Sequence, residues 1–318
     1  MATRTSFDLP YPDLSVERQG NTGTPGVWYF DSGKPGRTLM ITALIHGNEL
    51  CGAWALKDLL AAGLRPRQGS LILAFCNLAG YDAFDSNHHD ASRYLDEDLN
   101  RVWSDERLAD AGNRERQRAG ELLPWVRRAD WLLDLHSMHE PSAPLLLTGV
   151  LPRNVALARA LRAPRHVIVD AGHKDGVRLR DYGRFGDPAD ADALALLIEC
   201  GYHGDPASRL VARDMVARML LQSGVADEQD IPRDWLQPVP EGQRILEVTD
   251  AVVAPSMDLR FSSDWQGLET LPHKGDVIGW AGGQAITTPY DTCTLVMPSL
   301  RQLRPGVTVV RLARDYQG

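Results

Sequence analysis

The fold of this chain can be worked out from one stretch, Arg37-Thr-Leu-Met-Ile-Thr-Ala-Leu-Ile-His-Gly-Asn-Glu-Leu-Cys-Gly52. Residues 39–45 have the apolar, β-branched character and the length of a buried strand, and the run stops at His46. A helical pattern follows over residues 50–62. His46 and Glu49 are therefore predicted on the turn from the carboxyl edge of a strand into a helix, where open α/β sheets place ligands.

The size and charge of the chain exclude several classes of function. With 318 residues, 43% of them hydrophobic, it can form one large α/β domain and a smaller second one. The formal net charge is -8 and the basic residues are scattered, which argues against a nucleic-acid partner. The N-terminus lacks an apolar signal core, and no stretch approaches the roughly 20 apolar residues that span a bilayer. We expect a cytoplasmic protein with no membrane partner.

The four cysteines are far apart and form no Cys-x-x-Cys pattern. This spacing indicates reduced, mostly buried thiols, and neither a disulfide framework nor a sulfur-ligated zinc site. The residues are Cys51, Cys76, Cys200 and Cys293.

Further apolar runs continue the alternation of strands and helices, which predicts an α/β fold. Strands are expected at 26–30, 70–76, 130–136, 145–150, 166–169 and 193–198, and helices at 104–128, 154–162 and 208–223. Residues 77–101 are polar and aperiodic, and so long a loop is more often functional than idle. Residues 170–192 form either a loop over a site or a surface excursion.

The composition changes near the C-terminal quarter of the chain. Residues 228–242 contain three prolines among polar residues and are interpreted as a linker. After it, short apolar segments alternate with Gly and Pro turns, which favours a small all-β module over residues 243–318. Residues 1–227 are then the predicted catalytic domain.

Three side chains at strand ends suggest a metal site: His46, Glu49 and His136. Two imidazoles and one carboxylate leave zinc a fourth position for water, as in carboxypeptidase A. Asp134 precedes His136 by two residues, so both point to one side of a strand, and it can orient the ligand ring. The alternatives are a solvated pair at a helix start, a hydrogen-bonded core histidine, and a salt-bridged or capping Asp134.

The loop from Arg93 to Arg101 brings two guanidinium groups and the amide of Asn100 together. Such a loop can bind an anionic substrate and stabilise an oxyanion. Its alternative is a surface loop whose own acids, Asp96, Glu97 and Asp98, pair with the arginines. Glu199 ends an apolar run, and near an activated water it can accept the proton and pass it to the leaving amine.

Four short motifs occur in an order that resembles the succinylglutamate desuccinylase/aspartoacylase family, a branch of the zinc carboxypeptidase-like hydrolases. They are His46-Gly-Asn-Glu49, Arg93 followed by Asp98-Leu-Asn-Arg101, Asp134-Leu-His136, and Glu199-Cys-Gly201. The matches extend over about residues 37–203. The resemblance implies a zinc carboxypeptidase-like mixed β-sheet flanked by helices, with one zinc ion per chain held by His46, Glu49 and His136. The C-terminal module is similar in general character only.

The same resemblance implies roles for the remaining candidates. Glu199 would be the general base and acid, and Arg93 would polarise the scissile carbonyl. Asn100 and Arg101 would bind the carboxylate of a small N-acyl amino acid. The implied reaction is hydrolysis of a linear amide by water activated at the metal ion.

The chain departs from the family where the acyl group is selected. After His136 it reads Ser-Met-His139-Glu140-Pro-Ser, and the acidic, Ala-rich residues 188–193 stand where aspartoacylases carry an arginine upstream of the base. Arg180 and Arg184 are the candidates to substitute for it. The acyl group and the amino acid therefore remain open, as do substrate contacts from three nearby residues, His139, Tyr202 and His203.

Two other functions are compatible with these motifs. One is a zinc carboxypeptidase acting on short peptides, and the other is a catalytically inactive metal-binding homologue. A plain interaction module has no supporting patch or linear motif in the sequence. A homo-oligomer is compatible with the chain.

Overall fold

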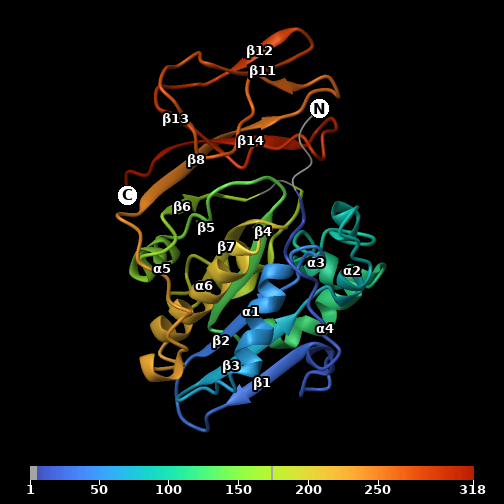
Figure 1. Ribbon diagram of the computed structural model, residues 1–318, viewed down its shortest axis with the longest axis vertical. Helices are drawn as coiled ribbons and strands as arrows, with labels where there is room; N and C mark the ends of the chain where they lie inside the picture. The colour runs from blue at the N-terminus through green and yellow to red at the C-terminus, as the bar shows by residue number, and fades with distance from the viewer. Residues whose placement is uncertain (1–5, 173–174) are drawn as a thin grey trace.

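An 11-stranded mixed sheet runs the length of the molecule in the computed structural model, which describes residues 6–172 and 175–318. The strand order is β1-β3-β2-β4-β7-β5-β6-β8-β14-β13-β10 (Figure 1). The first seven strands are β1 (Val27–Asp31), β2 (Thr38–Ala43), β3 (Ser70–Phe75), β4 (Trp131–Met138), β5 (Leu145–Leu147), β6 (His166–Val169) and β7 (Leu194–Tyr202). β3, β2, β4 and β7 are parallel neighbours, whereas β1 and β5 join the sheet antiparallel.

Helices cover both faces of this sheet. They are α1 (Leu50–Ala61), α2 (Leu78–Asp82), α3 (Asp105–Leu108), α4 (Arg114–Arg128), α5 (Pro152–Leu161) and α6 (Ala207–Ser223). None of the described helices is long and apolar enough to cross a membrane.

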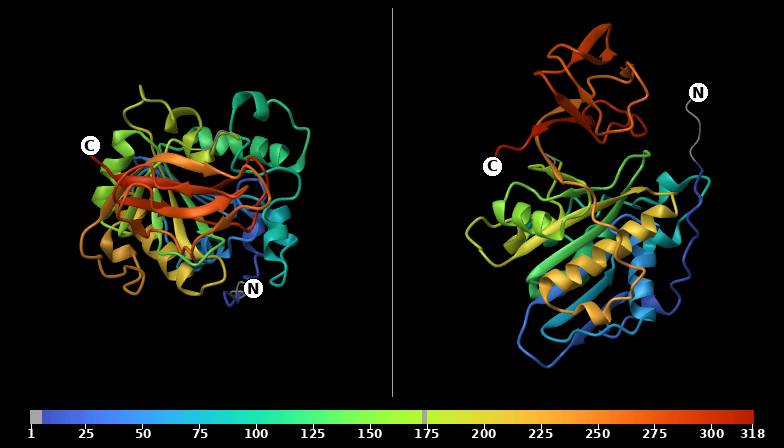
Figure 2. Two further views of the ribbon diagram at one scale, coloured as in Figure 1. Left: turned by 90° about the horizontal axis from the view of Figure 1, so that it is seen from above. Right: turned by 60° about the vertical axis from the view of Figure 1, so that its left-hand side comes forward.

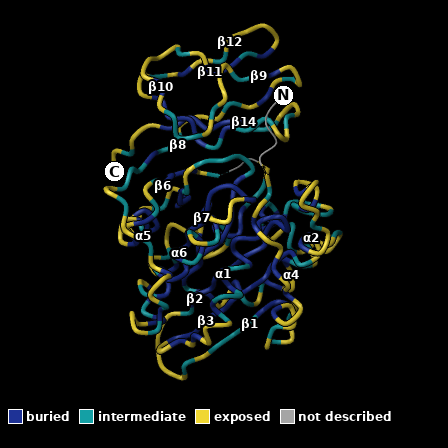
Figure 3. Tube along the Cα trace, viewed as in Figure 1, coloured by how far each residue is buried: buried dark blue, intermediate teal, exposed yellow. Residues whose placement is uncertain are grey.

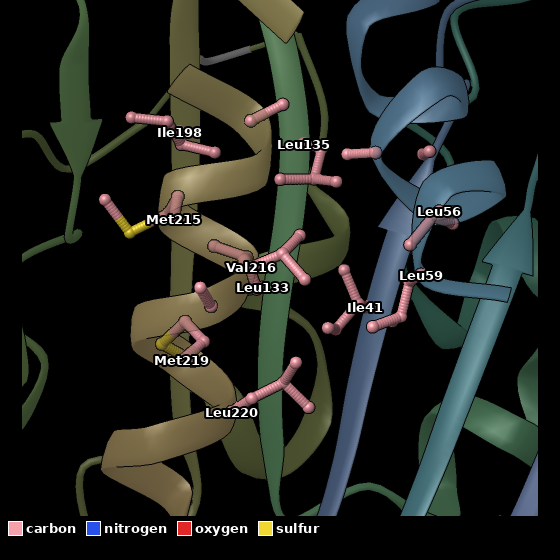
Figure 4. Close-up of a cluster of buried hydrophobic side chains, with 14 of the residues drawn as sticks. Ile41, Leu56, Leu59, Leu133, Leu135, Ile198, Met215, Val216, Met219 and Leu220 are labelled. Atoms are coloured by element: carbon pink, nitrogen blue, oxygen red, sulfur yellow. The ribbon is translucent and has the colours of Figure 1, made fainter. Parts of the chain in front are cut away.

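The largest core lies between the sheet and the helices α1 and α6 (Figure 4). Leu56 and Leu59 of α1 and Leu220 of α6 pack with Ile41 and Leu133 of the strands, and all five are fully buried. Each such side chain contributes roughly 1.5–3 kcal/mol on burial. Figure 3 shows this buried centre and the exposed rim around it. The packing fixes α1 against β2 and so fixes the turn between them.

The C-terminal segment contains strands and no helix among its described residues from 244 on. Its strands are β8 (Arg244–Val253), β9 (Arg260–Phe261), β10 (Thr270–Leu271), β11 (Val277–Ala281), β12 (Gln284–Thr287), β13 (Cys293–Val296) and β14 (Thr308–Asp315). They lie together at one end of the molecule (Figures 1 and 2). β8 pairs in parallel with β6, so the long sheet continues into this segment, while β12, β11 and β9 form a second sheet.

Most of the expected strands and helices are present within a few residues of their predicted bounds. The single helix expected at 104–128 is wrong: Ser104 caps α3 and Asn113 caps α4, each accepting a hydrogen bond from a backbone N–H three residues on. The strands expected to stop at the site are also longer than predicted. β4 continues past His136 and β7 past Glu199, and these two residues are register partners. The division into domains at 228–242 stays a prediction.

Candidate metal centre and substrate cavity

The turn between β2 and α1 is held close to the loop that carries Arg93. Gly47 N–H donates to the carbonyl oxygen of Arg93 at 3.0 Å. A Cβ at position 47 would lie 2.2 Å from a backbone carbon of Gly80, so only glycine permits this approach. The contact brings Arg93 beside Glu49, where its Nη1 lies 3.3 Å from Oε1 of that carboxylate.

His46, Glu49 and His136 converge in the structure as the sequence predicts. The Nδ1 atom of His46 lies 2.7 Å from Glu49 Oε1, and the Nδ1 atom of His136 lies 2.7 Å from Glu49 Oε2. All three side chains are buried, and one potential ligand atom from each lies within 4.8 Å of the others. Two neighbouring strands, β2 and β4, thus deliver the ligands to one point.

A second carboxylate lies behind each imidazole. His46 Nε2 is 2.9 Å from Asp98 Oδ1, and His136 Nε2 is 2.9 Å from Asp134 Oδ2. Because ionised carboxylates only accept hydrogen bonds, each ring donates its Nε2–H outward and turns Nδ1 towards Glu49. Thr42 donates its hydroxyl to Asp134 Oδ1 at 2.7 Å and fixes that carboxylate.

Electrostatics make this cluster a site for a cation. Burial opposes ionisation of Glu49, but the charges and hydrogen bonds of His46 and His136 outweigh it and hold the carboxyl pKa well below its usual range. Burial likewise opposes protonation of His136, but Asp134 and Glu49 raise its pKa well above the usual value. Three carboxylates thus surround two imidazoles, and a positive charge between them is favoured.

The donor set fits zinc. Zinc takes imidazole nitrogen and carboxylate oxygen, and a catalytic site commonly offers three protein ligands and one open position. His46, Glu49 and His136 supply three, with carboxylates orienting both rings. The same residues line a cavity of about 190 Å³, so a fourth position can face a substrate.

Glu199 lies next to the cluster on β7, opposite His136 in register. Its side chain is buried, and its Oε2 has no hydrogen-bond partner among the described residues. Burial, followed by the negative charge of Glu49, raises the pKa of Glu199 to about 8, while His136 and Arg93 oppose the shift. A carboxylate poised to gain a proton near neutral pH therefore faces the same cavity.

Residues from the C-terminal strands and their loops line part of the cavity. Among the lining residues are Gln266, Met297, Pro298, Thr308 and Arg311. The remaining walls come from the sheet and from the loops after β2, β3, β4 and β6. The cavity is small, with charged groups at the cluster and apolar side chains such as Leu147 and Leu197 on the wall.

Arg93 and Arg101 both line this cavity but differ in their partners. Arg93 contacts Glu49 and, through Nη2 at 3.4 Å, Asp98. Arg101 donates to the carbonyl oxygen of Asn100 at 2.8 Å and forms no ion pair with any described carboxylate. Burial, and then the nearby positive charges of Arg93 and other arginines, lower the pKa of Arg101 against the attraction of Asp98.

The acidic residues of the loop from Arg93 to Arg101 have different partners in the structure. Asp98 lies at the cluster and contacts Arg93. Glu97 pairs instead with Arg116 at 2.6 Å, on α4. Asn100 is buried, and its Oδ1 accepts a hydrogen bond from Leu179 N–H at 3.0 Å. Its Nδ2 faces His136.

The sequence-based suggestion of Arg180 and Arg184 is corrected by their placement. Neither side chain lines the cavity. Arg184 is half exposed and pairs with Asp190 and Asp130 on the surface. Arg180 is fully buried, lines a separate cavity and contacts Asp181.

Two other arginines, Arg178 and Arg311, line the cavity. The sequence left open which arginine takes the place of the one that selects the acyl group. Asp170 lies between them, 3.5 Å from Arg178 Nη1 and 3.2 Å from Arg311 Nε. Arg178 lies within residues 170–192, which were predicted to be either a loop over a site or a surface excursion, and no sequence pattern singled out Asp170 or Arg311. Of the three residues left open as substrate contacts, His139 lines the cavity, whereas Tyr202 and His203 are not among its lining residues.

Comparison with known proteins agrees with this site. Residues 35–189 match the model of the succinylglutamate desuccinylase/aspartoacylase catalytic domain, a span that contains the three cluster residues. The chain belongs to this family. It is 25% identical to a succinylglutamate desuccinylase of Burkholderia cenocepacia over 304 residues, 87% of this chain and 82% of that protein. A succinylglutamate desuccinylase of Burkholderia pseudomallei is 24% identical, and the alignment covers 90% of this chain and 83% of that protein.

Solved structures of similar fold include other members of the family. A succinylglutamate desuccinylase/aspartoacylase from Rhodobacter sphaeroides matches with a TM-score of 0.64 and 20% identity, covering 90% of this chain and 87% of that one. A product-bound ectoine utilization protein EutE from Ruegeria pomeroyi matches with a TM-score of 0.64 and 18% identity, covering 90% and 88%. These matches establish the mixed α/β fold shared with the family.

Proposed function

We propose that this protein is a zinc-dependent amidohydrolase that removes the acyl group from a small N-acyl amino acid. One zinc ion per chain would be held by His46, Glu49 and His136 in the zinc carboxypeptidase-like manner. The observation that carries the proposal is the buried His-Glu-His cluster, which shares a small cavity with the carboxylate of Glu199, whose Oε2 has no hydrogen-bond partner among the described residues. Relatives named succinylglutamate desuccinylase support an acyl amino acid as substrate.

In this proposal Glu199 moves the proton. A zinc ion, when bound, activates water and polarises an amide carbonyl. Glu199 accepts the proton of the attacking water and later gives it to the departing amine nitrogen, which is why a pKa near neutrality suits it. Asp98 and Asp134 keep the two imidazoles oriented.

Two arginines would bind two different groups of the substrate, the scissile carbonyl and the carboxylate of the amino acid. Arg93 reaches the cluster and would donate to the carbonyl oxygen as negative charge develops on it, a contribution of roughly 3–4 kcal/mol. Arg101 has no carboxylate partner among the described residues and would take the carboxylate of the amino acid. The buried amide Nδ2 of Asn100 would donate beside it.

The cavity favours a small N-acyl amino acid over a peptide. Its volume is about 190 Å³, below the roughly 300–1,000 Å³ of typical ligand pockets, and C-terminal residues line part of it. A carboxypeptidase would need an open groove for several residues. A catalytically inactive metal-binding homologue would have no need for a buried carboxylate in the cavity whose Oε2 lacks a hydrogen-bond partner among the described residues, as that of Glu199 does.

The deciding experiment is a hydrolysis panel on the zinc-loaded protein. N-acetyl, N-formyl, N-succinyl and N-aroyl amino acids are compared with short peptides, and the released amine is measured. We expect turnover of at least one N-acyl amino acid, little turnover of peptides, and its loss in Glu199→Gln with zinc retained. Glu121→Gln, a matched change at a half-exposed surface glutamate, should leave the rate unchanged. Turnover of peptides alone would favour the carboxypeptidase, and a zinc-bound, inert protein would favour the inactive homologue.

A further inference from the structure

His139 stands at the cavity without a role in the reaction as described so far. It follows directly after β4, three residues beyond His136, and its side chain is 19% exposed. Its Nε2 atom lies 3.3 Å from Arg93 Nη1, and its Nδ1 atom lies 3.0 Å from Asp90 Oδ1. The ring therefore connects Arg93 to a carboxylate of the loop after β3.

Two of the three polar partners of His139, Arg93 and Asp90, define its tautomer. The third is His203, whose Nε2 atom lies 3.3 Å from His139 Nδ1. A guanidinium group only donates hydrogen bonds, so Nε2 must accept from Arg93 with its lone pair. An ionised carboxylate only accepts, so Nδ1 must carry the hydrogen that faces Asp90. His139 is then a neutral imidazole. Burial, assisted by the positive charge of Arg93, lowers its pKa in spite of Asp90, which agrees with the neutral form.

Asp90 is itself held in place as the acceptor. Its hydrogen bonds with His139 and His89 lower its pKa well below the usual range, so it stays ionised. Arg301, from the C-terminal segment, lies 3.6 Å from its Oδ2 atom and 2.8 Å from Glu140. The support of His139 thus comes from two other parts of the chain, the loop after β3 and the C-terminal segment.

A neutral acceptor has a consequence for Arg93 that a carboxylate would not have. The other two contacts of Arg93 are carboxylates, Glu49 at 3.3 Å and Asp98 at 3.4 Å, and both pair with cluster histidines. A third carboxylate would cancel more of the guanidinium charge, and that charge is what stabilises an oxyanion. The lone pair of a neutral imidazole accepts the second N–H of Arg93 Nη1 and so orients the guanidinium group. It does not cancel the positive charge of that group.

We propose that His139 is a positioning residue, which holds the Arg93 guanidinium by accepting a hydrogen bond from Nη1 through an uncharged nitrogen. The proposal rests on the role of Arg93 in the proposed function. Through Asp90 and Arg301 the position of Arg93 is also tied to the C-terminal segment.

Three substitutions of His139 test this in the zinc-loaded full-length protein. His139→Leu removes the acceptor and should lower kcat about 10- to 100-fold with KM and zinc content retained, because the guanidinium is misplaced. His139→Gln can accept from Arg93 through its carbonyl and donate to Asp90, and it should restore kcat to within about 5-fold of wild type. His139→Glu keeps an acceptor but adds negative charge, and it should be as slow as the leucine variant. His88→Leu, at a side chain that is 74% exposed, is the matched control and should be unchanged.

Full activity of His139→Leu, or a glutamine variant as slow as the leucine variant, would overturn the proposal. Full activity of His139→Glu would overturn the requirement for an uncharged acceptor.

A measurement that needs no activity separates this proposal from the proposed function. In the long-range ¹H–¹⁵N spectrum of zinc-loaded protein with labelled histidine, the His139 signals are identified by their loss in His139→Gln. We expect the neutral Nδ1–H form, with an Nε2 shift that changes in Arg93→Met. An Nε2–H or doubly protonated ring would refute the positioning role. If the wild type shows this tautomer and yet hydrolyses no N-acyl amino acid, the proposed function fails and the contact stands.

Discussion

Replacing Arg101 by methionine removes a positive charge from the cavity while keeping a side chain of similar length. In wild type this guanidinium has a carbonyl oxygen as its hydrogen-bond acceptor and no carboxylate partner among residues 6–172 and 175–318. Burial and the nearby arginines lower its pKa, so its charged form is disfavoured in the folded protein. The variant should therefore fold at least as well as wild type, with no fall in Tm beyond about 2 °C.

The cost should appear in substrate binding. Each charge-assisted hydrogen bond contributes about 1.5–3 kcal/mol. Arginine can form two such bonds with a carboxylate, and because their geometry is seldom ideal we assign the Arg101–carboxylate pair about 2–4 kcal/mol in total. This corresponds to an increase of about 30- to 700-fold in KM. The decisive assay compares an N-acyl amino acid with its carboxamide. Wild type should discriminate between them by that factor, and Arg101→Met should not.

Two outcomes would refute this reasoning. If Arg101→Met still distinguished the carboxylate from the carboxamide as wild type does, another residue would bind the carboxylate, with Arg178 and Arg311 as the nearest lining candidates. If the variant lost several degrees in Tm, Arg101 would have a structural partner and would not be held ready for a substrate.

Three further predictions concern the cluster and the groups beside it. Arg93→Ala should lower kcat about 100- to 1,000-fold with zinc content kept, whereas His46→Ala should lose the metal, as elemental analysis will show. Asp134→Asn should weaken zinc binding about 10- to 100-fold in a competition titration, because the hydrogen-bond acceptor of the His136 ring loses its negative charge. As pH falls, kcat/KM should be lost with a midpoint between the ordinary glutamate pKa of 4.5 and about 8. Glu199 must be ionised to act, and a bound cation lowers its raised pKa. An acidic midpoint at or below 4.5 would contradict this.

Local patterns predicted the positions of the cluster residues because those residues follow directly from strand and helix signals. The apolar run 39–45 ends at His46, and the run 193–198 leads into Glu199. In a sheet whose strands are parallel at this point, such positions meet at one edge. The ends of β4 and β7 were less predictable, because each apolar run stops at a polar residue, His136 or Glu199, whereas the strand continues past it into further buried residues.

The rest of the cavity depends on contacts between residues far apart in the sequence. Arg311 meets Asp170 across 141 positions, and its strand, β14, is connected to β6 and the rest of the catalytic half of the sheet through β8. No local pattern distinguishes Arg311 from the surface arginines of the same segment, nor Arg178 from Arg184 in an aperiodic loop. The contact of His139 with Arg93 depends in the same way on the loop after β3 folding back over β4.

The central claim is that His46, Glu49 and His136 hold one zinc ion beside Glu199. Crystals of zinc-loaded protein, measured on both sides of the zinc absorption edge, test it directly. The account predicts a single anomalous peak per chain, about 2.0–2.2 Å from Nδ1 of both histidines and from a Glu49 oxygen. No peak at this cluster, or a peak held by other residues such as His139 and His203, would contradict it.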